Sequence, residues 1–194
     1  MTNSMNQLSK VCVKVYAPEP QGIGDDASVY VPIFHEWIRR GDLGMVAIDV
    51  ADYAHVPDSP GIMLVAHEAA FALDRTDGRF GLLGQRRTPV AGGAAASIAT
   101  TLRQVLQVAE RLQGEPQLAQ ALRFDPSSLR IESNDRLNGP NTVDGFLAFE
   151  VAVREAVASV FPAGGIEVER IPNDPRDRLA VSVRIDGVAT DRAA

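Results

Sequence analysis

The sequence predicts an α+β fold, in which a mostly antiparallel β-sheet carries its helices on one face. Short runs of alternating apolar and polar residues predict strands, and three longer stretches with apolar residues three or four apart predict helices. Segments rich in Pro, Gly, Asn and Asp separate neighbouring strand runs and predict hairpins. The order strand, helix, hairpin occurs twice. We therefore expect two βαββ-like halves joined by a helix, with a ferredoxin-like arrangement as the nearest simple topology.

The first half begins with a strand and a helix. Residues 10–16 alternate valines with Cys12, Lys14 and Tyr16, which predicts a strand with one buried face. Residues 17–28 contain two prolines and two glycines and predict a loop. Pro32 suits the first turn of the following helix and Gly41 suits its end. The apolar face of that helix comprises Ile33, Phe34, Trp37 and Ile38.

A meander of three strands completes the first half. Residues 45–54 and 62–74 are apolar, strand-like runs, and the Pro-Asp-Ser-Pro-Gly segment 57–61 between them predicts a turn. Asp77-Gly78 predicts a second tight turn, which leads into residues 80–86.

The rest of the chain repeats this order after a linking helix at about 94–112, where apolar residues recur at helical spacing. Residues 118–124 predict a further helical turn, and 129–133 a short strand. Thr142 is suited to cap a third helix, which Pro162 ends. Alternating strands at 166–171 and 179–185 form the last hairpin.

These elements predict one globular domain over residues 1–187, with pseudo-halves at about 10–87 and 118–186. Residues 188–194 predict a short disordered tail. The chain has 194 residues, which is enough to bury one core.

Composition narrows the class of protein. The apolar share of 45% and charged share of 23% are typical of a soluble globular protein. A net charge of −6 argues against a nucleic-acid partner. No apolar run is long enough for a membrane helix, so no membrane partner is expected. Cys12 is the only cysteine, which fits a reducing cytoplasm, and we interpret it as a small strand residue.

The first hairpin concentrates titratable side chains among apolar strand residues. It contains His55 and His67, two of the three histidines in the chain, with Asp49, Asp52 and Glu68 nearby. If its turn centres near residues 58 and 59, Asp52 and His67 become cross-strand neighbours. Such a pair orients an imidazole, raises its basicity or supplies two metal ligands. The structural alternative is that Asp52 and His55 cap the turn.

The predicted ligand-binding residues are Asp52, His55, His67 and Glu68, with Arg136 as a partner for an anion. The candidate ligands for a divalent metal are Asp52, His55 and His67, although their spacing matches no established zinc motif. If the protein is an enzyme, the pattern favours general acid–base chemistry or metal-assisted hydrolysis with a histidine as base.

Three other polar segments have two readings each. Asp25-Asp26 suits a hard cation or the N-terminus of the following helix. Arg86-Arg87, ahead of Gly92-Gly93 and a helix, suits an anion or an ordinary helix start. The polar loop 134–142 predicts a structured turn from strand to helix, in which Arg136 binds a ligand or a neighbouring acid.

Several of these segments resemble a family of bacterial proteins that has no assigned function. The segments are Asp52-Tyr53-Ala54-His55, Gly61 through His67-Glu68, and Asn134-Asp135-Arg136-Leu137 with Pro140-Asn141-Thr142. The resemblance covers most of the chain and implies a complete, single-domain bacterial protein. It implies no activity, cofactor or catalytic residue.

Two functional readings follow. The first is a cytoplasmic protein that binds a small polar ligand or a metal at the first hairpin. The alternative is a non-catalytic, homo-oligomeric interaction or scaffold protein, which pairs through a sheet face or edge with Trp37, Phe71 and Phe80 at the interface. The glycine fingerprint for dinucleotides, the Gly-x-Ser-x-Gly elbow and the His-Glu-x-x-His motif do not occur. The sequence leaves open whether the protein is an enzyme.

Overall fold

The computed structural model describes residues 5, 7–20, 29–53, 55–56, 59–118 and 121–188. In chain order the elements are β1 (Val11–Tyr16), α1 (Tyr30–Arg40), β2 (Ala47–Asp52), β3 (Ile62–Ala66), β4 (Ala69–Asp74), β5 (Gly81–Arg86), α2 (Gly93–Gly114), β6 (Asp125–Ser133), α3 (Val143–Val160), β7 (Ile166–Arg170) and β8 (Ala180–Ile185). The predicted cation site at Asp25-Asp26, part of the turn 57–61 and most of the predicted tail lie outside the described residues.

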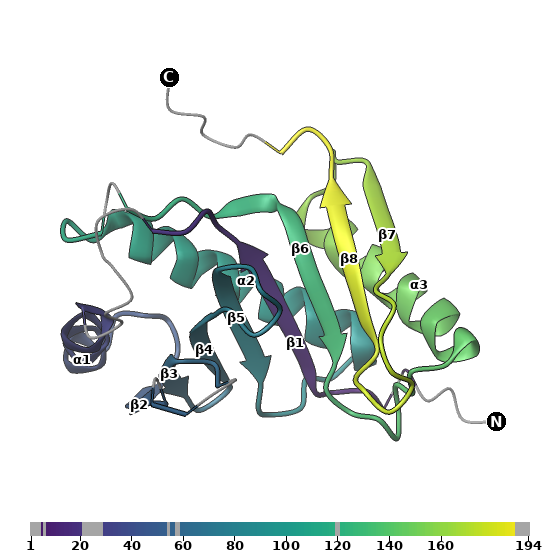
Figure 1. Ribbon diagram of the computed structural model, residues 1–194, viewed down its shortest axis with the longest axis horizontal. Helices are drawn as coiled ribbons and strands as arrows, with labels where there is room; N and C mark the ends of the chain where they lie inside the picture. The colour runs from purple at the N-terminus through teal and green to yellow at the C-terminus, as the bar shows by residue number, and fades with distance from the viewer. Residues whose placement is uncertain are drawn as a thin grey trace.

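All strands of the described chain belong to one antiparallel sheet, in the order β2-β3-β4-β5-β1-β6-β8-β7 (Figure 1). The predicted α+β class and antiparallel sheet are therefore confirmed, and the ferredoxin-like arrangement is not. Strands β1 and β6 lie side by side in the middle of the sheet, although most of the chain separates them in sequence.

The alternation in β1 determines which face of the sheet is apolar. Val11, Val13 and Val15 are fully buried and belong to the hydrophobic core. Lys14 and Tyr16 point to the opposite face, since side chains alternate along a strand. The helices cover the face that carries the valines, because α2 packs on β1 and β5 and also against α3. Figure 1 shows α2 and α3 behind the sheet.

Gly84 allows α2 to approach the sheet closely. Gly84 pairs with Val13 of β1, and a Cβ atom at this position would overlap the Val105 side chain of α2. The small residue in β5 therefore sets the distance between the long helix and the middle of the sheet.

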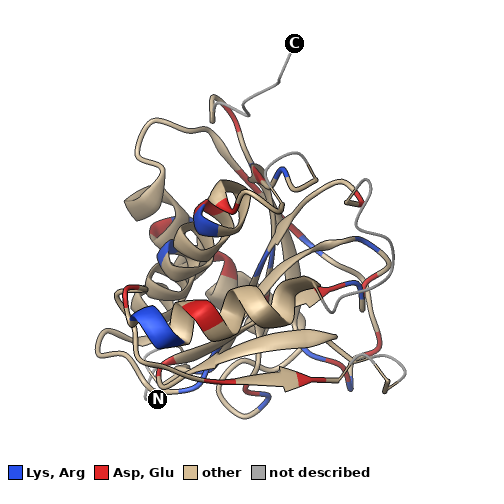
Figure 2. Ribbon diagram, turned by 90° about the vertical axis from the view of Figure 1, so that its left-hand side faces the viewer, with Lys and Arg blue, Asp and Glu red and all other residues tan. Residues whose placement is uncertain are grey.

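Helix α1 covers the end of the sheet at β2 and β3. Trp37 is fully buried, and its indole Nε1 donates a hydrogen bond of 2.6 Å to Glu115 just beyond α2. Gly41 ends the helix with φ of 64°, as its position in the sequence predicts. On the outer side of α1, Glu36 pairs with Arg39 and Arg40, so charges of both signs lie close together there (Figure 2).

The single strand predicted over residues 62–74 is wrong. It is two strands, β3 and β4, which pair with Met63 opposite Ala72 and Val65 opposite Ala70. His67 and Glu68 lie in the two-residue connection between them. Apart from Asp74 at the end of the run, these two are its only polar residues, and a turn at this position keeps both out of the core side of the sheet.

The proposed interface role of Trp37, Phe71 and Phe80 is also wrong, because all three side chains are at most 2% exposed and belong to the core. Among the described residues, no helix is long and apolar enough to cross a membrane.

Candidate functional site

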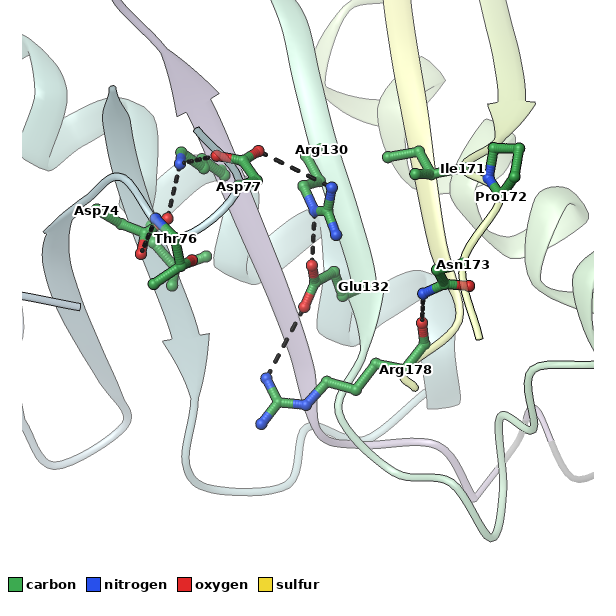
Figure 3. A pocket seen from close by; sticks show the side chains of 11 residues that line it. Asp74, Thr76, Asp77, Arg130, Glu132, Ile171, Pro172, Asn173 and Arg178 are labelled. Carbon is green, nitrogen blue, oxygen red and sulfur yellow. Dashed lines mark hydrogen bonds and ion pairs between the residues drawn. The ribbon is translucent and has the colours of Figure 1, made fainter. Parts of the chain in front are cut away.

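A pocket of about 370 Å³ lies on the sheet face opposite the helices (Figure 3). Its floor comes from β1, β5 and β6, and its two walls come from the β4–β5 turn and the β7–β8 connection. We call it the sheet-face pocket. The lining residues are Lys14, Asp74, Thr76, Asp77, Leu83, Arg130, Glu132, Ile171, Pro172, Asn173 and Arg178.

Strand alternation brings the polar floor together. Leu129 and Ile131 of β6 are buried in the core, so Arg130 between them and Glu132 after them face the pocket. Arg130 is the register partner of Lys14 across the β1–β6 pair. The central strands therefore present charged residues on one face and valine, leucine and isoleucine on the other.

Lys14 forms the buried end of the site. Its side chain is 1% exposed, and its ammonium Nζ donates to Asp74 Oδ2 and Asp77 Oδ1, both at 2.6 Å. The third donor reaches the carbonyl oxygen of Arg79 at 2.7 Å. All three ammonium protons have acceptors, so Lys14 fastens the β4–β5 turn to the sheet and has no donor left for a ligand.

Asp77 connects this buried cation to the rest of the pocket. Tyr16 donates its hydroxyl proton to Asp77 Oδ2 at 2.7 Å, and Arg130 Nη1 lies 3.9 Å from the same oxygen. Burial alone would raise the pKa of Asp77, but the hydrogen bonds from Lys14 and Tyr16 hold the pKa below its usual value. Asp77 thus stays ionised between two cations that would otherwise repel one another across neighbouring strands.

Tyr16 stays protonated for related reasons. Burial raises the pKa of its hydroxyl, and the hydrogen bond to Asp77 raises it further. The guanidinium of Arg79 lies over the Tyr16 ring, 3.5 Å from the ring centre.

The other end of the pocket is more accessible. Arg130 Nε donates to Glu132 Oε1 at 2.6 Å, and Arg178 Nη1 lies 3.8 Å from Glu132 Oε2. The side chain of Arg178 is 50% exposed and makes no side-chain hydrogen bond within the described chain. Figure 3 shows Arg130, Glu132 and Arg178 in sequence along the pocket.

The whole site is a chain of alternating charges, in which each group contacts the next. Its members, from the buried end to the accessible end, are Asp74, Lys14, Asp77, Arg130, Glu132 and Arg178. The chain ends in a buried acid on one side and in a half-exposed cation on the other. Its accessible end can donate hydrogen bonds to a ligand.

Cys12 lies on the same sheet face but offers no nucleophile. It is 1% exposed, and burial raises the pKa of its thiol to about 12, with a further contribution from Glu132. The thiol therefore stays protonated at neutral pH, in agreement with its interpretation as a small strand residue.

The structure does not bring the predicted hairpin site together. Asp52 pairs with Ile62 at the turn end of β2, whereas His67 follows the other end of β3, roughly 16 Å away along the strand. The predicted cross-strand pair of Asp52 and His67 is therefore wrong. The strands pair about a centre at residue 57, because β2 ends at Asp52 and the connection therefore begins before the predicted turn, whereas β3 begins at Ile62 as predicted.

The other predicted site residues lie apart. His55 is exposed in the β2–β3 connection, and Arg136 is exposed in the β6–α3 connection. Glu68 is half-buried, and its Oε2 atom is buried without a hydrogen-bond partner. Within the described chain, no three His, Cys, Asp or Glu side chains are placed to hold a metal ion together. That any one of these residues binds a ligand separately stays a prediction.

The remaining sequence candidates have structural roles. Arg86 is buried, and its guanidinium donates to the carbonyl of Thr88 and to Gln104 at 2.9 and 2.7 Å. Arg87 donates to the carbonyl of Ala66. Both side chains therefore already have acceptors. Thr142 caps α3 by accepting from the Gly145 N–H, as its position predicts.

Sequence reasoning missed Lys14, Arg130 and Glu132. The sequence signal that could have revealed them is a charged residue in an otherwise apolar, alternating strand. Such a residue on a central strand needs an oppositely charged partner or must face a site. No family model matches this chain, and no curated protein shows significant similarity to it.

Proposed function

We propose that this protein binds a small polar ligand in the sheet-face pocket. The observation that carries the proposal is the accessible end of the pocket, where the Arg178 guanidinium has hydrogen-bonding capacity left beside Arg130. Leu83, Ile171 and Pro172 supply apolar contact in the same space. A volume of about 370 Å³ falls within the range of ligand pockets.

Both walls of the pocket are also held in place by hydrogen bonds, which favours a role in ligand binding. Lys14 fixes one wall, and the other wall is tied down by Asn141 at the start of α3. Asn141 is buried, and its amide donates to Asn173 Oδ1 at 2.8 Å and to the carbonyl of Asp174 at 3.0 Å. Asn173 in turn donates to the carbonyl of Arg178 at 2.8 Å. Pre-organised walls lower the entropic cost of binding.

A screen by thermal shift tests the proposal, with cationic, neutral and anionic small molecules. Thr76→Trp narrows the pocket at its exposed rim, and Ala158→Trp places the same side chain on an exposed position of α3 as a control. We expect ligands that stabilise the wild type and Ala158→Trp but not Thr76→Trp. Equal stabilisation of all three, or no stabilisation by any class of compound, contradicts the proposal.

Self-association is the second candidate function, and one observation favours it. Leu137, Val143, Leu147 and Val151 are between 54 and 87% exposed, and the last three follow one stripe along α3. Light scattering at low concentration gives the mass in solution, for comparison with the 20.8 kDa of one chain. A multiple of this mass that reverts to one chain on Leu147→Asp supports the scaffold reading, and a monomeric wild type refutes it.

We also propose that the sheet consists of two related halves. Supporting this, β1 and β6 each lead into a helix and then into antiparallel strands, the last of which lies beside the first strand of that half. The pocket floor crosses the junction between the two halves.

A further inference from the structure

We infer that the ligand of the sheet-face pocket is an oxyanion, a carboxylate or a phosphate, held between Arg130 and Arg178. This inference rests on the proposed binding function and specifies the ligand class. It is carried by the donors, the charge and the burial at the accessible end of the pocket.

The donors are present and unfilled. Of the Arg130 guanidinium, only Nε makes a hydrogen bond in the described chain, to Glu132 at 2.6 Å. Its Nη1 lies 3.9 Å from Asp77, and Arg178 Nη1 lies 3.8 Å from Glu132, both beyond hydrogen-bonding distance. A guanidinium has five N–H donors, and two parallel donors match the two oxygens of a carboxylate or phosphate.

The local charge favours an anion. Lys14 and Tyr16 already engage the acids at the buried end, Asp74 and Asp77. At the accessible end Glu132 is the one acid among the lining residues, and two arginines face it. Arg130 is only 21% exposed. An ion pair made there is screened less by water than one on the open surface.

Glu132 occupies the position that a ligand carboxylate would take. One of its oxygens meets Arg130 and the other faces Arg178. Glu132 therefore acts as an internal competitor, and it holds the two guanidinium groups in place while the pocket is empty. Removal of its negative charge, with its shape kept, should strengthen anion binding.

Binding of inorganic phosphate and of succinate, measured by calorimetry, tests the inference, with succinamide as the neutral analogue. Arg178→Gln should weaken binding of both anions by about tenfold or more, as expected for the loss of a charge-assisted hydrogen bond. Arg176→Gln is the matched control, because Arg176 lies in the same connection, is 88% exposed and pairs with Asp174 instead. Glu132→Gln should bind both anions more tightly, and Arg178→Lys should recover part of the affinity.

The outcomes separate the two proposals. Binding of phosphate alone, or of succinate alone, identifies which oxyanion geometry the pocket takes and supports the inference. An equal loss of anion affinity in Arg176→Gln and Arg178→Gln overturns the inference, as does weaker anion binding by a folded Glu132→Gln. If neutral or cationic molecules bind in the pocket and anions do not, the binding function stands and the oxyanion inference fails. If no class of molecule binds, both fail.

Discussion

Replacement of Lys14 by methionine tests whether the buried end of the charge chain holds the fold together. Methionine keeps most of the length of the lysine side chain but removes the ammonium and its three hydrogen bonds. Asp74 is 2% exposed and would lose its cation, and Asp77 is 14% exposed and would keep the hydrogen bonds from Tyr16 and the Arg79 N–H and the more distant Arg130. Removal of one partner from a buried ion pair typically costs about 3–5 kcal/mol, because it leaves an uncompensated buried charge.

Urea unfolding of wild type and Lys14→Met at pH 7 measures this difference, since the midpoint shifts while the slope stays constant. The double variant Lys14→Met, Asp74→Asn serves as the control. It removes the charge that the single variant leaves buried, so it should regain part of the lost stability. A single variant within about 1 kcal/mol of the wild type would refute the structural role of Lys14.

The pH dependence of the same variant gives a second measurement. In the wild type the folded pKa of Asp77 lies below its unfolded value of about 3.8, so its contribution to stability is present above that pH and is lost on further acidification. In Lys14→Met the hydrogen bond that lowers the pKa of Asp77 is gone, whereas burial, which raises this pKa, remains. The deficit relative to the wild type should therefore shrink as the pH falls toward 4. A deficit that is constant from pH 7 to pH 4 contradicts this account.

Three further predictions follow from the core and the pocket wall. Gly84→Ala should destabilise the protein by about 1–3 kcal/mol in urea unfolding, because the added methyl overlaps Val105, and an unchanged midpoint would mean that α2 moves away freely. Asn141→Ala should cost about 1–3 kcal/mol and should weaken any anion binding at Arg178, and full retention of both would show that the connection needs no anchor. Cys12 should react with a thiol reagent only as fast as the protein opens, and immediate reaction of the native protein would contradict its burial.

Local patterns in the sequence predict most of the fold. Helix α1 ends at Gly41 and α3 begins at Thr142, as their capping residues indicate. The strand over residues 62–74 could not be divided correctly, because Ile62 to Ala66 and Ala69 to Leu73 are both apolar and the turn between them lacks Gly, Pro, Asn and Asp. His67-Glu68 therefore gives little sequence signal for a turn, and the pairing of β3 with β4 determines that the chain turns there.

The candidate site was harder to predict than the fold. A cluster of histidines and acids close in sequence drew attention to the first hairpin, but a register difference of a few residues separates Asp52 from His67. The sheet-face pocket draws on strands far apart in sequence, and the pairing of Lys14 with Arg130 depends on the order of strands in the sheet. Such an order follows from packing of the whole chain and leaves no local pattern.

The central position of the β1–β6 pair also links ligand binding to folding. Lys14 comes from near the start of the chain, and Arg178 comes from the last connection before the final strand, so no fragment of the chain can carry the complete pocket. The pocket forms only when β1 pairs with β6 in the middle of the sheet. Any ligand that binds there recognises the native state alone and raises the free energy of unfolding by mass action. The same molecule would reduce local opening at both ends of the sequence, which makes hydrogen exchange in β1 and β8 a joint indicator of occupancy.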